Sequence, residues 1–170
     1  ANTKIPYKYM LHYSTDVPLS IRALLYVPST HNEKNQLMQE GTEVSLYSRR
    51  VLIKEKCQEL LPHYLRFVKG VVDCEDLPLN ISRENYQDSS LVNKLRNVVT
   101  RRVIKHIDDE AKRDPEKYKK WFADFGNFIR EGIPVDNENK EALFRLLRFV
   151  SRNNGPNTII SLEDYIKKMK

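Results

Sequence analysis

The sequence predicts an α/β fold in which a mixed sheet flanked by helices is followed by a compact helical bundle. Two observations predict it. The first half holds short runs of β-branched and aromatic residues that end at prolines, glycines and polar segments, as strands do. In the second half the apolar residues recur at spacings of three and four, which is typical of helices. We therefore predict an α/β subdomain over residues 1–110 and a helical subdomain over residues 111–170.

The first half is predicted to consist mainly of strands. Residues 9–13 alternate between two faces, which is typical of a strand with one face in water. The other expected strands are residues 21–27, 44–53 and 64–72, with a short helix over residues 54–61. Residues 29–43 are polar and unpatterned, so they are predicted to form a mobile loop. Gly70 indicates either a bulge or the close approach of another backbone.

The second half is predicted to form helices. The longest has an apolar stripe of Leu91, Leu95, Val98, Val99, Val103 and Ile107. Asp114 and Pro115 predict the start of the next helix, because Asp caps helices and proline fits the first turn. Its buried face is expected to carry Tyr118, Trp121, Phe122, Phe125, Phe128 and Ile129. A third helix is expected to carry Leu143, Leu146, Leu147 and Val150, and Ser161 is expected to cap a last helix with Leu162, Tyr165 and Ile166.

Composition narrows the function classes. The chain has 170 residues, 40% of them hydrophobic, so it can bury a core without disulfides or metal. No apolar run approaches the roughly 20 residues that span a bilayer. The net charge of +6 would suit a nucleic acid or an anionic surface, but the basic residues alternate with acids, which also fits a solvated surface. The chain begins at Ala1 rather than at methionine, so we expect a piece of a longer protein.

The usual catalytic motifs are missing from the sequence. It contains no phosphate-binding glycine loop and no G-x-S-x-G motif. The histidines are not spaced as metal ligands, so no metal site is predicted. Cys57 and Cys74 lack metal spacing and are predicted to be reduced thiols of an intracellular protein.

One polar segment suggests a binding function. Residues 73–84 connect a buried strand to a helix and place Arg83 near the helix start, with Gln87 one turn later on the same face. A cation disfavours a helix N terminus, whereas an anion bound there would be stabilised by the helix dipole and by the donors of Arg83. Two interpretations remain open here: Arg83 binds an anion, or it pairs with a nearby acid such as Glu75 or Asp76.

The same segment carries a family resemblance. Residues 67–84, FVKGVVDCEDLPLNISRE, resemble the middle-domain signature of the 90-kDa heat-shock chaperone family. Further matching features are LYSRRVLI at residues 46–53, LLRF at residues 146–149 and SLEDY at residues 161–165. The opening YMLHYSTDVPLSIR at residues 9–22 and REGI at residues 130–133 are most similar to the mitochondrial, tumour-necrosis-factor-receptor-associated branch. The departures include Cys74 where the family has serine, and Tyr86, which could change the aim of Gln87.

The resemblance implies a function. The family is a dimeric, ATP-driven chaperone, a heat-shock protein of the stress response that binds unfolded proteins. Its middle domain completes the ATPase site of the N-terminal domain and binds clients. Carried over to this sequence, Arg83 would contact the γ-phosphate of ATP, and Asn80 and Gln87 would position the loop, the phosphate or the attacking water. Arg83, Asn80 and Gln87 are therefore the candidate catalytic residues, with Arg83 also the candidate ATP-binding residue.

Partners and location follow from the same resemblance. The expected partners are the N-terminal ATPase domain of the same chain and client proteins, with no nucleic acid and no membrane span. The full-length protein is expected to use ATP with Mg²⁺ and to form a homodimer, whereas this fragment alone is expected to be a monomer without cofactor or ATPase activity. The expected location is the mitochondrial matrix, with the cytoplasm as the alternative. A basic nucleic-acid-binding module remains the alternative function, favoured by charge alone.

Overall fold

The computed structural model describes residues 6–31, 33, 41–79, 90–150 and 159–168. The chain forms two compact units, Ala1–Val103 and Ile104–Lys170. The boundary between the units lies inside helix α1 (Ser90–Arg113), and the boundary predicted at residue 110 lies inside the same helix.

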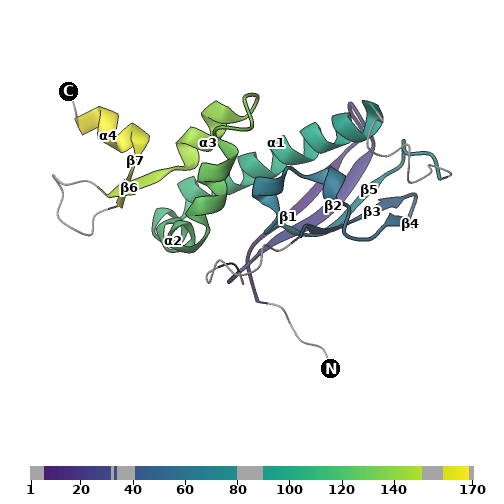
Figure 1. Cartoon of the computed structure of the whole chain (residues 1–170), viewed down its shortest axis with the longest axis horizontal. Helices are drawn as coiled ribbons and strands as arrows, with labels where there is room; N and C mark the ends of the chain where they lie inside the picture. The colour runs from purple at the N-terminus through teal and green to yellow at the C-terminus, as the bar shows by residue number, and fades with distance from the viewer. Residues whose placement is uncertain (1–5, 32, 34–40, 80–89, 151–158, 169–170) are drawn as a thin grey trace. The chain divides into compact units, whose positions relative to one another are not determined.

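Unit 1 is built on a five-stranded mixed sheet (Figure 1). Its strands are β1 (Tyr7–Thr15), β2 (Ile21–Pro28), β3 (Glu43–Ser48), β4 (Val51–Lys54) and β5 (Lys69–Cys74). The order across the sheet is β1-β2-β5-β3-β4; β3 and β5 run parallel and the other neighbours antiparallel. The mixed sheet confirms the predicted fold class. Strand β5 therefore lies at the centre, and its carboxyl end emerges between β2 and β3.

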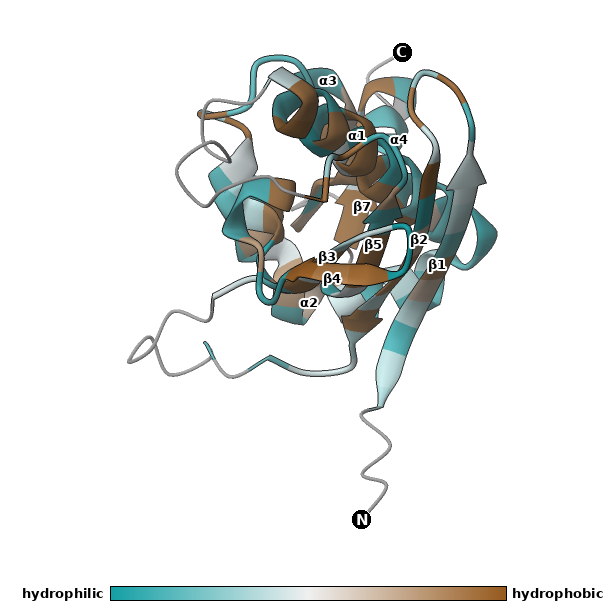
Figure 2. Ribbon diagram, turned by 90° about the vertical axis from the view of Figure 1, so that its right-hand side faces the viewer, coloured by the Kyte–Doolittle hydropathy of each residue, from teal (hydrophilic) through white to brown (hydrophobic). Residues whose placement is uncertain are grey.

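One face of the sheet forms the core of unit 1. Alternate residues of each inner strand are buried, including Ile21 of β2, Val44 of β3 and Val72 of β5. The first part of α1 lies over the sheet in Figure 1 and buries Leu95 and Val99. Figure 2 colours β4 as strongly hydrophobic, although its Val51 and Leu52 are exposed at the edge of the sheet.

The predicted bulge or close approach at Gly70 is confirmed as a close approach. Gly70 has a φ of 135°, and it pairs with Leu25 of β2. A Cβ atom at this position would overlap the carbonyl oxygen of Leu24. Only glycine therefore lets β5 lie this close to β2.

Three predictions in unit 1 were wrong. The run 44–53 is not one strand but the hairpin of β3 and β4, with a turn at Arg49 and Arg50. Residues 54–61 do not form an α-helix; only a single turn of 3₁₀ helix, η2 (Gln58–Leu60), is present, because the Cys57 N–H donates to Val44 O of the sheet.

The expected strand over residues 64–72 also begins later than predicted. Its first residues form a second 3₁₀ turn, η3 (His63–Leu65), and β5 starts only at Lys69. The Arg66 side chain stabilises this turn by donating to the carbonyl oxygen of His63 at 3.0 Å. Apolar content alone does not separate a buried turn from a strand, so the sequence pattern was misleading here.

Unit 2 contains the end of α1, three further helices and a two-stranded sheet. The helices are α2 (Pro115–Gly132), α3 (Lys140–Leu146) and α4 (Leu162–Lys168), and the sheet pairs β6 (Arg148–Val150) with β7 (Ile159–Ser161). The predicted start of α2 is confirmed, because Asp114 Oδ1 accepts the Lys117 N–H at 3.0 Å and Pro115 is the first residue. Val150, which was predicted to lie in the third helix, instead lies in β6 and is exposed.

The aromatic face of α2 forms the core of unit 2, as predicted. Tyr118, Trp121 and Phe125 are almost completely buried. The rings of Trp121 and Phe125 stack with centroids 5.2 Å apart and planes 6° from parallel. The Tyr118 hydroxyl donates to Leu146 O at 2.8 Å, which ties α2 to the end of α3. Residues with helical spacing therefore bury one continuous apolar stripe.

Candidate functional site

The candidate site lies where the central strand β5 ends. The described chain continues from β5 through residues 75–79, which form the base of the predicted functional loop. The candidate residues Asn80, Arg83 and Gln87 lie outside the described residues. The structure therefore shows how the loop begins, and the contacts at its base set where the next residues start.

The start of β2 holds the first part of the loop base. The Glu75 N–H donates to Ser20 O at 3.0 Å, and the Ser20 N–H donates to Asp76 Oδ2 at 2.7 Å. This reciprocal pair fixes both the backbone and a side chain of the loop base. Arg22 of β2 also lies 3.8 Å from Glu75, but both side chains are largely exposed, so this ion pair adds little.

The β3–β4 hairpin holds the other side of the loop base. Ser48 at the end of β3 donates its hydroxyl to Leu77 O at 2.7 Å, and this hydrogen bond is buried. The Arg50 N–H donates to Asp73 Oδ2 at 2.8 Å. Leu77 itself is 2% exposed, whereas Leu79 is 53% exposed. The chain is thus buried and fixed at Leu77 and reaches the surface two residues later.

The hairpin turn has a backbone conformation that its residues disfavour. Arg49 and Arg50 have φ angles of 50° and 66°, in the left-handed region that glycine and asparagine adopt most easily. Two-residue hairpins require such angles when they match the twist of the strands. The hydrogen bond from the Arg50 N–H to Asp73 helps to hold the turn in this conformation.

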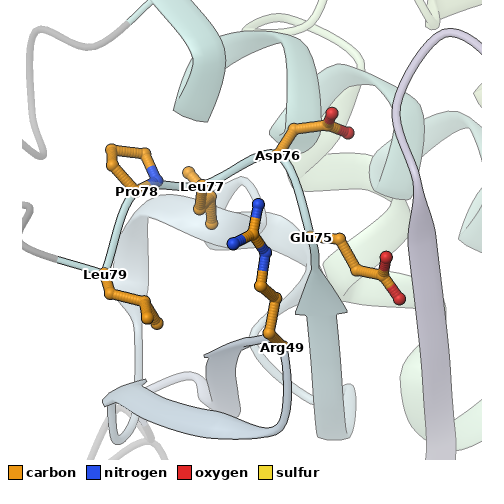
Figure 3. A pocket seen from close by; sticks show the side chains of 6 residues that line it. All are labelled: Arg49, Glu75, Asp76, Leu77, Pro78 and Leu79. Atoms are coloured by element: carbon orange, nitrogen blue, oxygen red, sulfur yellow. The ribbon is translucent and has the colours of Figure 1, made fainter.

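A cavity of about 490 Å³ opens beside this turn. It is lined by Arg49 and by the loop base from Glu75 to Leu79. In Figure 3 the Arg49 side chain extends from the hairpin toward the loop base, with the side chains of Leu77 and Glu75 on either side. The arrangement places a guanidinium and two carboxylates next to the exposed side chain of Leu79.

The cysteines are not part of a reactive site. Both are free and buried, in agreement with the predicted reduced thiols. Burial raises the pKa of Cys57 to about 12, with the hydrogen bond to Glu59 adding to the shift. Burial also raises the pKa of Cys74. Since the thiolate is the reactive form, neither side chain is a nucleophile at neutral pH.

Within the described residues, no three side chains of His, Cys, Asp or Glu come together as metal ligands. Of the helices in the described ranges, none is both long enough and apolar enough to cross a bilayer.

The acids suggested as partners for Arg83 lie in the loop base. These acids, Glu75 and Asp76, already contact Arg22 and the Ser20 N–H. A carboxylate accepts several hydrogen bonds, so these contacts leave room for a further donor.

Sequence reasoning missed the roles of Ser48 and Arg49, because the strand pattern continues through them. Two consecutive arginines between two β-rich runs gave no turn signal.

Fold and site together define an α/β domain that presents a braced loop at the end of its central strand and carries an attached helical unit. The chain belongs to the Hsp90 protein family, because the profile of that family matches residues 3–170.

Individual relatives agree with this assignment. The chain is 48% identical over 166 residues to heat shock protein 75 kDa, mitochondrial, of Bos taurus, covering 96% of this chain and 24% of that protein. It is 47% identical over 165 residues to the mitochondrial TNF receptor-associated protein 1 homolog of Dictyostelium discoideum, covering 95% and 23%. It is 45% identical over 160 residues to chaperone protein HtpG of Desulfitobacterium hafniense, covering 94% and 26%. The chain thus spans about a quarter of the length of these relatives.

Proposed function

We propose that this chain is the middle domain of an ATP-dependent chaperone and that it supplies Arg83 to the ATPase site of the N-terminal domain. Membership of the Hsp90 family supports the general assignment. The observation that carries the proposal is the braced loop base. Hydrogen bonds from Ser20, Ser48 and Arg50 fix residues 73–77 immediately before the segment that holds Asn80, Arg83 and Gln87.

Bracing of this kind suits a group that must reach a ligand on another domain. A guanidinium stabilises developing charge on a transferred phosphate only when its position is fixed beforehand. In the proposed role Arg83 contacts the γ-phosphate of ATP, while Asn80 and Gln87 position the loop, the phosphate or the attacking water. In this proposal ATP and its Mg²⁺ are held by the N-terminal domain.

The partners and the location are part of the same proposal. One of these relatives is named chaperone protein HtpG, and on this basis we propose that the full-length protein binds and folds client proteins. We propose a homodimer for the full-length protein and a monomer for this chain alone. Two of the relatives named above are mitochondrial and one is bacterial, which favours the mitochondrial matrix, with the cytoplasm as the alternative.

The test is ATP turnover by the full-length protein carrying Arg83→Ala. We expect kcat to fall at least about tenfold, and up to the 10³–10⁵ typical of arginine fingers. The Kd for ATP should change much less, because the nucleotide is held by the N-terminal domain. Arg83→Lys should restore little activity, since an ammonium lacks the planar fork of donors.

A matched control keeps this test specific. Arg96→Ala removes a half-buried arginine of α1 that the proposal does not place at the nucleotide, and it should leave kcat unchanged. A near-normal kcat for Arg83→Ala would contradict the phosphate contact and would favour the ion pair of Arg83 with a nearby acid.

The alternative of a nucleic-acid-binding module gains nothing from the described surface of α1. Lys105 pairs with Asp109 at 3.1 Å and Lys112 with Asp108 at 2.5 Å, so acids interrupt the basic residues. Phosphate contacts need unpaired cations in a row. Filter binding of this chain to DNA and RNA at two salt concentrations should show no tight, salt-sensitive binding. A steep loss of affinity with salt would support the alternative.

A further inference from the structure

Unit 2 contains a groove that is lined by both charged and apolar residues. It is a different site from the loop base in unit 1. Its volume is about 550 Å³, within the range of ligand pockets. It is lined by residues of α1, α2, α4 and β7 and by Arg145 and Arg148. The groove does not share any residue with the cavity beside Arg49.

Positive charge predominates in the lining. The cations are Lys112, Lys119, Arg145, Arg148 and Lys167. The carboxylates are Asp108, Glu163 and Asp164, so the cations outnumber them by two. An excess of this kind favours a ligand that brings carboxylates of its own.

Several of these side chains already have partners. Lys112 pairs with Asp108, and this contact raises the pKa of the lysine. Asp164 accepts the Ser161 hydroxyl at 2.7 Å, and this hydrogen bond lowers the pKa of the carboxyl. Asp108, Lys112 and Asp164 therefore already have partners within the groove.

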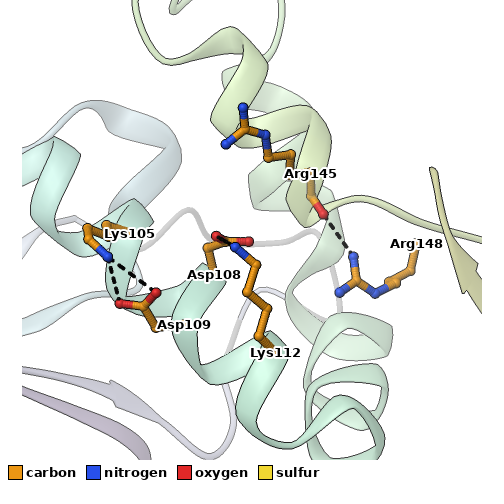
Figure 4. A network of polar contacts seen from close by, with 6 residues as sticks. All are labelled: Lys105, Asp108, Asp109, Lys112, Arg145 and Arg148. Atoms are coloured by element: carbon orange, nitrogen blue, oxygen red, sulfur yellow. Dashed lines mark hydrogen bonds and ion pairs between the residues drawn. The ribbon is translucent and has the colours of Figure 1, made fainter. Parts of the chain in front are cut away.

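The arginines are differently placed. Arg148 Nη1 donates only to carbonyl oxygens in the described structure, those of Arg145 at 2.9 Å and Leu147 at 2.8 Å, and its guanidinium lies over the Tyr118 ring. Arg145 is exposed, and it forms no ion pair with any residue that the structure describes. Figure 4 shows its guanidinium pointing away from Arg148, on the side of the Asp108–Lys112 pair.

The apolar part of the groove is the edge of a strand. Ile159, Ile160 and Ser161, the three consecutive residues of β7, all line it. Neighbouring side chains of a strand point to opposite faces, so a groove that touches all three runs along the edge of β7. The other edge of β7 pairs with β6. Among the described strands, none occupies the edge that faces the groove.

We propose that this groove binds an extended peptide segment of a protein partner, with acidic and apolar residues in alternation, added as a strand along β7. Backbone hydrogen bonds to the free edge would supply affinity, as in other cases of strand addition. Alternate side chains of the peptide point to opposite sides. Its carboxylates would therefore meet Arg145 and Lys112 on one side, while its apolar side chains would pack on the other side, on Ile160 and Ala111.

Fluorescence anisotropy with a labelled hexapeptide of alternating Glu and Leu tests the proposal on this chain. We expect saturable binding that weakens with salt, and no comparable binding of the same peptide with Lys in place of Glu. The double variant Arg145→Gln, Lys112→Gln should weaken binding of the Glu–Leu peptide by about tenfold. Both side chains are exposed, so circular dichroism should show an intact fold.

Lys105→Gln is the matched control. Lys105 lies on the same helix as Lys112, and each of the two lysines pairs with an aspartate four residues away (Figure 4). Lys105 does not line the groove. Its substitution should leave the Kd of the peptide unchanged. Equal weakening in the control and the groove variant, equal binding of the Lys peptide, or no saturable binding at millimolar peptide would each overturn the proposal.

Discussion

The contacts that stabilise unit 1 differ in kind from those that stabilise unit 2. Unit 1 contains buried polar contacts that join residues far apart in the sequence. Arg66, only 2% exposed, binds Glu33 through two hydrogen bonds of 2.8 Å each, and Ser48 binds Leu77 O. Unit 2 is held mainly by the aromatic face of α2, together with the buried hydrogen bond from the Tyr118 hydroxyl to Leu146 O. Its ion pairs join side chains three or four residues apart on one helix, such as Lys105 with Asp109 and Lys119 with Glu116.

The two kinds of contact differ in how precisely they fix the position of a segment of the chain. Apolar packing stabilises a helix bundle but tolerates small shifts, because contacts between carbon atoms have no direction. A buried hydrogen bond has a direction, and leaving it unmade is costly. Unit 1 thus has directional contacts where β5 passes into the proposed functional loop. Substitutions in the two units should therefore differ in their effects: loss of apolar packing should lower stability, whereas loss of a directional contact should also displace the loop base.

The largest expected effect is on the chemical reactivity of Cys57 in unit 1. At pH 8 a thiol with a pKa of about 12 has about a thousandfold less thiolate than one at the ordinary 9.0. Alkylation of the native chain should therefore be at least about a thousandfold slower than in urea. Mass spectrometry of timed samples measures the rate. Rapid native labelling would show that the polar interior of unit 1 opens readily.

The same thiol predicts the direction of a pH effect. The unfolded thiol loses its proton near pH 9.0 and the folded one near pH 12. The stability that Cys57 contributes is therefore fully present below pH 9.0 and is lost as pH rises toward 12. Urea unfolding between pH 8 and 11 should show this alkaline loss, and Cys57→Ala should reduce it.

Trp121→Ala should cause the largest loss of stability by mutation. The side chain is buried against Phe125, and removing a buried Trp costs about 3–5 kcal/mol of unfolding free energy. Urea unfolding followed by circular dichroism measures the change. Phe144→Ala is the control, because Phe144 is exposed on α3 and should cost under about 1 kcal/mol. Similar losses in both variants would contradict an apolar core centred on α2.

Arg66→Met should destabilise unit 1 by about 3 kcal/mol. The change leaves the carboxylate of Glu33 largely buried without its bidentate partner. The double variant Arg66→Met, Glu33→Leu should recover a substantial part of the loss, because it removes the uncompensated charge as well. Chemical unfolding of both variants measures the difference. No recovery in the double variant would show that Arg66 acts through packing rather than through its charge.

Ser48→Ala should have the smallest effect on stability, about 1–2 kcal/mol, since it leaves the buried carbonyl of Leu77 unpaired. Its effect should be concentrated at the loop base, with faster amide hydrogen exchange at Leu77 and Leu79. Ser14→Ala, at an exposed position of β1, is the matched control and should change neither quantity. Unchanged exchange in Ser48→Ala would mean that the loop base does not depend on this hydrogen bond.

Helix α2, its first residue and the protein family could all be predicted from the sequence alone. Helical periodicity gave α2 and its buried aromatic face, because residues three and four apart share a side of a helix. Asp114 and Pro115 marked the start of α2 for local reasons of backbone chemistry. The motif at residues 67–84 indicated the family, since side-chain identity in order needs no coordinates. The candidates Asn80, Arg83 and Gln87 stay predictions.

The contacts within unit 1 could not be predicted from the sequence pattern. The hairpin turn at Arg49 and Arg50 is invisible in the pattern, because its left-handed angles are sustained by the hydrogen bond to Asp73, which lies on another strand. The 3₁₀ turn at residues 58–60 likewise depends on a partner elsewhere in the fold, because Val44 O accepts the Cys57 N–H. Local sequence encodes local preference. Directional contacts between distant residues exist only after the chain has brought those residues together, and they determine where the loop base lies.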